Sequence, residues 1–171
     1  MHTPRRDEPP PVILAVCGPP GSGKTTIATR VHDQLSGSYR DAPDSPQNCD
    51  SDTDREIRLL HSDDFSRRPY EQMHDVVTAS DAHFILDGTF YKPEHQRPFL
   101  ELPDTHFVVI RAALDTCLRR DHERDGIGQK AVRVIHSEFH DPPADFVLDT
   151  DVLPVEDAVR LLTDRAREWL D

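Results

Sequence analysis

The chain has 171 residues, with 32 acidic and 20 basic side chains and a formal net charge of −12 at pH 7. This length fits one domain with a sizeable core, and no apolar run approaches the ~20 residues that cross a bilayer, which excludes a membrane-spanning class. No stripe of basic residues is visible, which weighs against nucleic acid as a partner without excluding it. Scarce lysine and abundant aspartate predict a halophile-like acidic protein. The 3 cysteines form no C-x-x-C pair, which argues against zinc or a disulfide framework and fits the cytoplasm.

Residues 1–11 are charged and rich in proline, so they are predicted to form a disordered tail rather than a secretory signal. The domain itself is expected to cover residues 12–171. It opens with a continuous apolar run at residues 12–17, which predicts a strand buried on both faces.

The strongest motif follows this strand. The stretch Gly18-Pro19-Pro20-Gly21-Ser22-Gly23-Lys24-Thr25 fits G-x-x-x-x-G-K-[ST], the phosphate-binding P-loop. Its backbone N–H groups are expected to point at a triphosphate, with Lys24 at the β/γ-phosphates and the Thr25 hydroxyl on Mg²⁺. A helix at residues 25–35 places the phosphates at a helix N-terminus, where the dipole favours anions. ATP and Mg²⁺ are therefore the predicted cofactors, held by Gly18, Pro19, Pro20, Gly21, Ser22, Gly23, Lys24, Thr25 and Thr26.

Residues 37–54 are rich in Asp, Ser and Pro, which predicts a flexible acidic insertion; a functional lid is the alternative interpretation. A second strand is expected at residues 57–61, and Asp63 and Asp64 follow it directly. Ligands sit beyond the carboxyl ends of strands in open parallel sheets, so Asp63 is the candidate base for an attacking hydroxyl. Asp64 is a candidate substrate contact, and the alternative is that both aspartates cap the helix expected at residues 70–79.

Several further side chains are candidates for contact with the acceptor substrate. Arginine is a planar fork suited to an anionic group, although surface arginines that contact only solvent have the same appearance in a sequence. A third strand is predicted at residues 83–87, and its final Asp87 matches the Walker B pattern that holds Mg²⁺. A loop and a short helix at residues 94–100 follow. The acceptor-contact candidates are Asp64, Phe65, Arg67, Arg68, Tyr91, Lys92 and Arg97.

The second half of the chain continues the alternation. Strands are predicted at residues 106–111 and 146–149, and helices at residues 114–124, 131–139 and 155–170. Arg120 and Arg124, followed by two glycines, resemble a mobile arginine lid that closes over ATP, with Arg120 also contacting the nucleotide. A helix with i, i+4 ion pairs and a glycine stop is the alternative. The histidines show no ligand spacing and are interpreted as surface or packing residues.

Strands alternating with helices around a P-loop predict a three-layer parallel α/β fold. From residue 12 to residue 170 the chain resembles the small P-loop kinases. The segment from His140 to Asp151 resembles the end of adenylylsulfate (APS) kinases, and Phe90-Tyr91-Lys92-Pro93 loosely resembles their F-I-S-P loop. By contrast, His61-Ser62-Asp63-Asp64-Phe65 looks more like the D-D-[YF] of polynucleotide kinase domains or the Q-D-D-F of nucleoside kinases. The resemblance implies a five-stranded sheet in the order 2-3-1-4-5, and it implies that Asp63 is the base.

The predicted activity is ATP- and Mg²⁺-dependent transfer of a γ-phosphoryl group to the hydroxyl of a small nucleotide- or nucleoside-like acceptor. Lys24, Asp63, Arg120 and Arg124 are the catalytic candidates, and Thr25 and Asp87 the metal ligands. A polynucleotide or tRNA kinase is the alternative within this class. A regulatory ATPase or nucleotide switch without an acceptor is the alternative from another class, although no N-K-x-D guanine motif occurs.

Overall fold

The computed structural model describes residues 8–37 and 55–171. Within these ranges a five-stranded parallel sheet runs in the order β2-β3-β1-β4-β5, so the predicted fold class is confirmed. The strands are β1 (Ile13–Cys17), β2 (Ile57–His61), β3 (His83–Asp87), β4 (Thr105–Arg111) and β5 (Phe146–Asp149). The helices are α1 (Lys24–Gly37), α2 (Pro69–Thr78), α3 (Pro93–Leu100), α4 (Leu114–Glu123), α5 (Gln129–Glu138) and α6 (Val155–Leu170).

The central strand explains why the sheet forms around this sequence. Every residue of β1 is buried, as its unbroken apolar run predicts, and β1 pairs in parallel with both β3 and β4. In its register with β3, Val16 is opposite Asp87. The P-loop after β1 therefore starts beside the carboxylate that ends β3.

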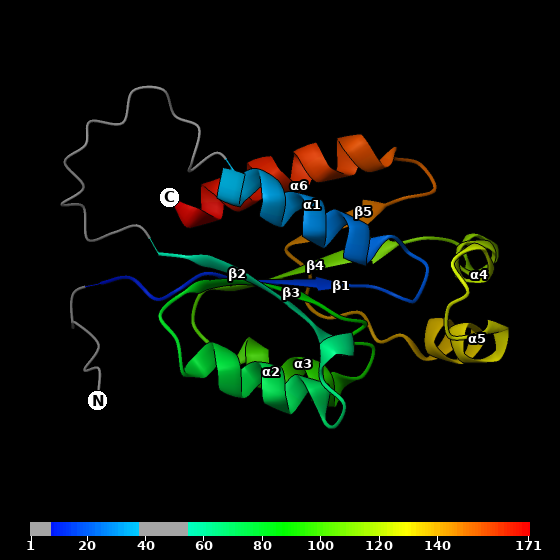
Figure 1. The fold of residues 1–171 in the computed structure, drawn as a ribbon, viewed down its shortest axis with the longest axis horizontal. Helices are drawn as coiled ribbons and strands as arrows, with labels where there is room; N and C mark the ends of the chain where they lie inside the picture. The colour runs from blue at the N-terminus through cyan, green and yellow to red at the C-terminus, as the bar shows by residue number, and fades with distance from the viewer. Residues whose placement is uncertain (1–7, 38–54) are drawn as a thin grey trace.

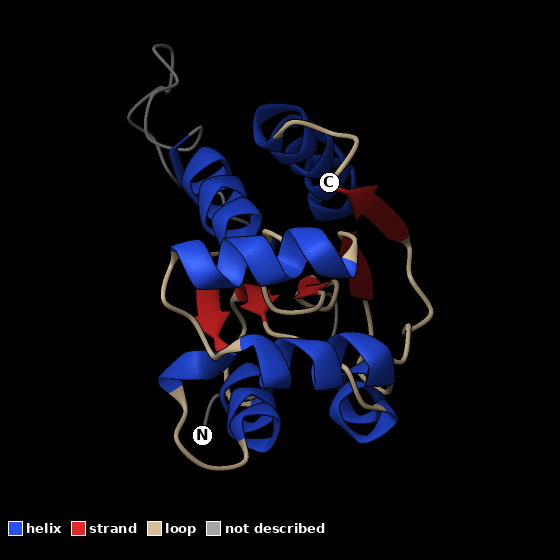
Figure 2. Ribbon diagram, turned by 90° about the vertical axis from the view of Figure 1, so that its right-hand side faces the viewer, coloured by secondary structure: helices blue, strands red, loops and turns tan. Residues whose placement is uncertain are grey.

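Helices cover both faces of the sheet and one of its ends. Helices α1 and α6 lie together on one face, and α2 and α3 lie on the other (Figure 1). The α1/α6 layer packs Ile27, Val31 and Leu162 against β1 and β4, whereas the opposite core contains Phe84, Phe90 and other aromatic side chains. Helices α4 and α5 lie beyond the carboxyl ends of the strands (Figure 1), and Figure 2 views the molecule from that end.

Most element boundaries agree with the sequence prediction to within one or two residues. Helices α2 and α3 each begin at a proline, one residue earlier than expected, because proline suits the first helical position. The short 3₁₀ helix η1 (Ser62–Asp64) was not predicted. The cap of α2 is Arg68, in a left-handed conformation and without a side-chain cap, so neither Asp63 nor Asp64 caps this helix.

The two segments expected to lack order fall mainly outside the described residues. Residues 1–7 of the predicted tail and residues 38–54 of the predicted insertion are not described. Of the remaining tail residues, Glu8 places its carboxylate 3.2 Å from the Arg55 guanidinium. None of the helices in the described ranges is long and apolar enough to cross a membrane.

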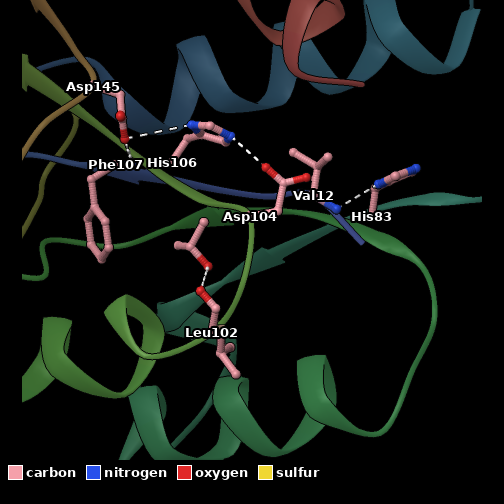
Figure 3. Close-up of polar contacts among 8 residues, drawn as sticks. Val12, His83, Leu102, Asp104, His106, Phe107 and Asp145 are labelled. Carbon is pink, nitrogen blue, oxygen red and sulfur yellow. Dashed lines mark hydrogen bonds and ion pairs between the residues drawn. The ribbon is translucent and has the colours of Figure 1, made fainter. Parts of the chain in front are cut away.

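At the amino ends of the strands, polar side chains hold the strand starts together (Figure 3). The backbone N–H of Val12 donates to His83 Nδ1 at 2.9 Å. His106 lies between two carboxylates, 3.0 Å from Asp104 Oδ1 and 3.7 Å from Asp145 Oδ2. The Trp169 ring stacks on His106 with centroids 4.2 Å apart, which fixes the end of α6 to the sheet.

Candidate active site

The loop between β1 and α1 adopts a backbone conformation that requires glycine at two positions. Gly21 and Gly23 have φ angles of 81° and 99°, in the region where a Cβ is strained. A Cβ on Gly21 would also collide with the backbone of Cys117 in α4. Helix α1 begins at Lys24, so the loop leads straight into a helix N-terminus, a preferred position for an anion.

Arg120 holds this loop from one side. Its Nη1 donates to the carbonyls of Gly21 and Ser22, at 3.2 and 3.1 Å, and to the Thr150 hydroxyl at 2.8 Å. The Thr150 hydroxyl in turn donates to the Ser22 carbonyl at 2.7 Å. Because C=O and N–H point in opposite directions across a trans peptide, the N–H of Gly23 points away from Arg120. Arg120 therefore supports the loop in this structure rather than facing the cavity described below.

Lys24 is almost fully buried, with 9% of its surface exposed. Burial lowers the pKa of its ammonium group, and the negative charge of Asp87 opposes that shift. A buried cation of this kind is costly without a partner, so the position suits a side chain that meets the phosphates of a nucleotide.

Asp87 joins the P-loop to the neighbouring strand. The Thr25 hydroxyl donates to Asp87 Oδ2 at 2.8 Å, and His61 Nδ1 lies 2.7 Å from the same oxygen. The second oxygen, Asp87 Oδ1, is buried and has no hydrogen-bond partner among the described residues. An orphaned carboxylate oxygen next to a hydroxyl fits Mg²⁺, which takes few protein oxygens and completes its shell with phosphates and water. The described residues contain no group of three or more His, Cys, Asp or Glu that could hold a metal by themselves.

A cavity of about 740 Å³ opens beside these groups at the carboxyl ends of the strands. Of the candidates predicted from the sequence, it brings together Pro20, Lys24, Thr25, Asp63, Phe65, Arg68, Tyr91 and Arg124. The buried Asp87 adjoins it through Thr25. The remaining candidates do not line it: Gly18, Pro19, Gly21, Ser22, Gly23, Thr26, Asp64, Arg67, Lys92, Arg97 and Arg120.

One wall of the cavity is built on Tyr70. Its hydroxyl accepts a hydrogen bond from the N–H of Phe90 at 3.0 Å and lies 3.0 Å from the Thr89 hydroxyl. The ring stacks on His95 with centroids 4.4 Å apart. Burial raises the pKa of Tyr70 and lowers that of His95. Phe90 itself has a φ of 47°, so these contacts hold a strained loop in place.

The segment after α4 is organised by a buried carboxylate. Asp121 accepts hydrogen bonds from the N–H groups of Ile127 and Gly128, both at 3.0 Å. Arg124 Nη2 lies 3.5 Å from Asp121 Oδ1, and Arg124 lines the cavity. The connection between α4 and α5 is thus anchored at its base and presents one arginine to the cavity.

Several cavity residues were not predicted from the sequence. Tyr70, Thr89 and His95 line the cavity and contact one another. His61, assigned from the sequence to surface or packing, does not line the cavity but contacts the Asp87 carboxylate. The register between β2 and β3 places His61 opposite Asp87. The available signal was a histidine at the last position of the predicted strand that precedes the strand ending in Asp87.

The fold and the loop define this protein as a P-loop NTPase. Residues 13–146 match the AAA_33 family, whose description is an AAA domain, and the chain belongs to that family. A shorter match, 31% identical over 103 residues, is to the ribosome biogenesis protein BMS1 of Saccharomyces cerevisiae. That match covers 58% of this chain but only 8% of the yeast protein.

Solved structures with the same fold include several small kinases. APS kinase CysC of Mycobacterium tuberculosis, in complex with AMPPNP and APS, has a TM-score of 0.68 and 18% identity over 93% of this chain and 99% of that chain. A gluconokinase from Sinorhizobium meliloti 1021 has a TM-score of 0.66 and 14% identity over 92% and 94% of the two chains. A sugar kinase from Janibacter sp. HTCC2649 has a TM-score of 0.61 and 20% identity over 95% of each. The predicted resemblance to small P-loop kinases is confirmed, and at these identities the likeness establishes the fold.

Proposed function

We propose that this protein is a kinase that transfers the γ-phosphoryl group of ATP to the hydroxyl of a small nucleotide- or nucleoside-like acceptor. The observation that carries the proposal is the shared cavity. Lys24 and Thr25 of the P-loop line it together with Asp63, which η1 places at the end of β2. A carboxylate beside a phosphate site is what an alcohol-phosphorylating enzyme needs.

In the proposed reaction, Asp63 accepts the proton of the acceptor hydroxyl as its oxygen attacks the γ-phosphorus. The bond between the γ-phosphorus and the β–γ bridging oxygen breaks, and ADP leaves. Lys24 and the N–H of Gly23 stabilise the phosphate charge, and Arg124 approaches it from the α4–α5 connection. Thr25 and Asp87 would hold Mg²⁺, which supplies charge neutralisation on the phosphates when bound. His61 orients the Asp87 carboxylate.

Among the acceptor candidates, cavity lining supports Phe65, Arg68 and Tyr91. Arg120 supports nucleotide binding indirectly, since it holds the carbonyls of Gly21 and Ser22. Of the two arginines predicted to form a lid, we assign to Arg124 the role of stabilising the charge on the transferred phosphoryl group.

The second candidate function is a nucleotide switch that hydrolyses ATP without an acceptor. The observation in its favour is the 31% identity to part of a ribosome biogenesis protein. The cavity favours the kinase, because a switch requires neither space for an acceptor nor a carboxylate to take the proton of an acceptor hydroxyl.

A labelling experiment separates the two functions. The full chain is incubated with γ-labelled ATP, Mg²⁺ and a panel of nucleosides, adenylylsulfate and 5′-hydroxyl oligonucleotides, at low and at molar salt. The kinase predicts a labelled acceptor, and Asp63→Asn lowers that transfer by about 1000-fold without weakening ATP binding. Asp64→Asn is the matched control, since Asp64 is exposed and does not line the cavity. ATP hydrolysis with no labelled acceptor, and no effect of Asp63→Asn, would favour the switch.

A further inference from the structure

Two sets of elements that differ in charge line the cavity. The P-loop and the end of α4 line what we call its phosphate end, and the segments from η1 to α2 and from β3 to α3 line what we call its acceptor end. Lys24 and Arg124 contribute the cations of the phosphate end. The elements of the acceptor end contribute three carboxylates, those of Asp63, Glu71 and Glu94, and Asp63 is near enough to the phosphate end to act electrostatically on Lys24. Arg68 is the one guanidinium that the described residues place at that end.

This arginine is already paired. Arg68 Nη1 lies 3.4 Å from Glu71 Oε2, one helical turn away at the start of α2. Two other basic candidates, Arg67 and Arg97, do not line the cavity. Lys92 places its ammonium 5.3 Å from the centre of the Tyr91 ring and is not part of the lining either. A sulfate, phosphate or carboxylate on the acceptor would therefore meet more negative than positive charge.

The uncharged groups at this end suit hydroxyl-rich molecules. Burial lowers the pKa of His95, which keeps its ring neutral near pH 7, and His95 Nδ1 has no hydrogen-bond partner among the described residues. Hydroxyl groups of Ser62, Ser66 and Thr89 lie in the same lining. Phe65 and Tyr91 add aromatic faces that accept a base or the C–H face of a sugar.

We infer that the acceptor is a polyhydroxylated molecule without an anionic group, neutral or carrying an amine that meets Glu71 and Glu94. Nucleosides and amino sugars share this chemistry, whereas nucleotides, adenylylsulfate and sugar acids do not. This inference rests on the proposed kinase function and narrows its acceptor. It assigns Glu71 and Glu94 as specificity-determining residues.

The test uses matched pairs of acceptors that differ in charge: adenosine against adenylylsulfate, and glucosamine against gluconate. Transfer from γ-labelled ATP and acceptor binding in the presence of a non-hydrolysable ATP analogue are both measured on the full chain. We expect the uncharged or aminated member of at least one pair to have a kcat/KM about 100-fold above that of its anionic partner. Comparing adenosine with glucosamine shows whether the acceptor is a nucleoside or an amino sugar.

Charge-neutral variants link any preference to these glutamates. Glu71→Gln combined with Glu94→Gln is expected to reduce the discrimination by about 10-fold, mostly through KM. Glu101→Gln is the control, because Glu101 caps α3, is exposed and does not line the cavity. Discrimination that survives the double variant would overturn the assignment of the glutamates.

The other outcomes distinguish this inference from the proposed function. Faster transfer to the anionic member of both pairs would overturn the acceptor class and leave the kinase intact. ATP hydrolysis without transfer to, or binding of, any of the four compounds would overturn both.

Discussion

The two ends of the sheet each contain a histidine next to aspartate, yet among the described residues only the carboxyl end also has the P-loop and a large cavity. At the carboxyl ends, His61 contacts Asp87 beside the P-loop and a cavity of about 740 Å³. At the amino ends, His106 lies between Asp104 and Asp145 and is covered by Trp169 (Figure 3). The pocket next to Trp169 holds about 10 Å³, roughly one water molecule at most.

The comparison shows that a histidine–carboxylate contact alone does not indicate chemistry. Parallel strands place their carboxyl ends, with the loops and helix N-termini that follow, at one edge. A glycine-rich loop leading into a helix N-terminus, a buried ammonium and a cavity of this size coincide only at that edge of the described structure. At the amino ends of the strands, histidine and aspartate side chains instead connect the beginnings of neighbouring strands, and His106 holds the end of α6 through Trp169. We therefore expect substitutions at the carboxyl end to alter activity and substitutions at the amino end to alter stability.

The largest expected effect is that of Lys24→Ala. Removing the buried ammonium should lower phosphoryl transfer by about 1000-fold, because the developing phosphate charge loses the cation of the P-loop. Stability should not fall, since burying this charge is itself costly. Labelled transfer and urea unfolding measure the two effects. Lys130→Ala, an exposed lysine at the start of α5, is the control. Equal activity of the two variants would contradict the assigned site.

The two arginines at the end of α4 should respond differently to removal. Arg124→Ala is expected to lower kcat by about 100-fold with little change in ATP affinity, because Arg124 faces the cavity. Arg120→Ala should weaken ATP binding by about 10-fold, since it removes the donors to the carbonyls of Gly21 and Ser22. Calorimetric ATP titration and steady-state kinetics separate these effects. If Arg120→Ala lowered kcat and Arg124→Ala weakened ATP binding instead, Arg120 would be the arginine that stabilises the transferred phosphoryl group.

These two arginines also show which features of the site could be predicted from the sequence and which could not. The P-loop, Asp87 and the alternation of strands and helices were predictable, because each is a local pattern with one physical explanation. Arg120 and Arg124 looked equivalent at i, i+4 spacing, but α4 ends at Glu123, so Arg124 leaves the helix and turns to the cavity.

The remaining site residues depend on pairing across distance. His61 reaches Asp87 only through the β2–β3 register, and Tyr70 reaches Thr89 and Phe90 only once α2 packs under β3. No local pattern encodes such contacts. The wall around Tyr70 was therefore not predicted, although Phe65, Arg68 and Tyr91, which also line the cavity, were among the predicted acceptor contacts.

The histidines of the two ends give a direct contrast. His61→Ala should lower activity by about 10-fold and raise the Mg²⁺ concentration needed for tight ATP binding, because Asp87 loses the group that orients it. His106→Ala should leave activity unchanged and lower the free energy of unfolding by about 1–2 kcal/mol, since Trp169 loses its stacking partner. Mg²⁺ titrations of ATP binding and urea unfolding check both. An activity loss in the His106 variant would remove the distinction between the ends.

The smallest expected effect is a pH dependence of stability that arises at the amino end. Burial lowers the pKa of His83, and the nearby Arg55 lowers it further, while Asp104 opposes the shift. His83 Nδ1 accepts the Val12 N–H, so protonation of the folded state would also break that bond. The unfolded chain takes up this proton as the pH falls below about 6.5, whereas the folded chain resists it down to its lower pKa. The unfolded state thus binds more protons in this range, and stability should fall as the pH is lowered.

His83→Asn removes the titrating ring while keeping an oxygen that can accept the Val12 N–H. We expect the slope of unfolding free energy against pH, measured by urea unfolding between about pH 7 and pH 5, to decrease by as much as one proton. Transfer activity at pH 7 should be unchanged, because His83 lies at the edge without the cavity. An unaltered slope would mean that His83 titrates alike in the folded and unfolded chains, and a loss of activity would mean that the two edges are coupled through β3.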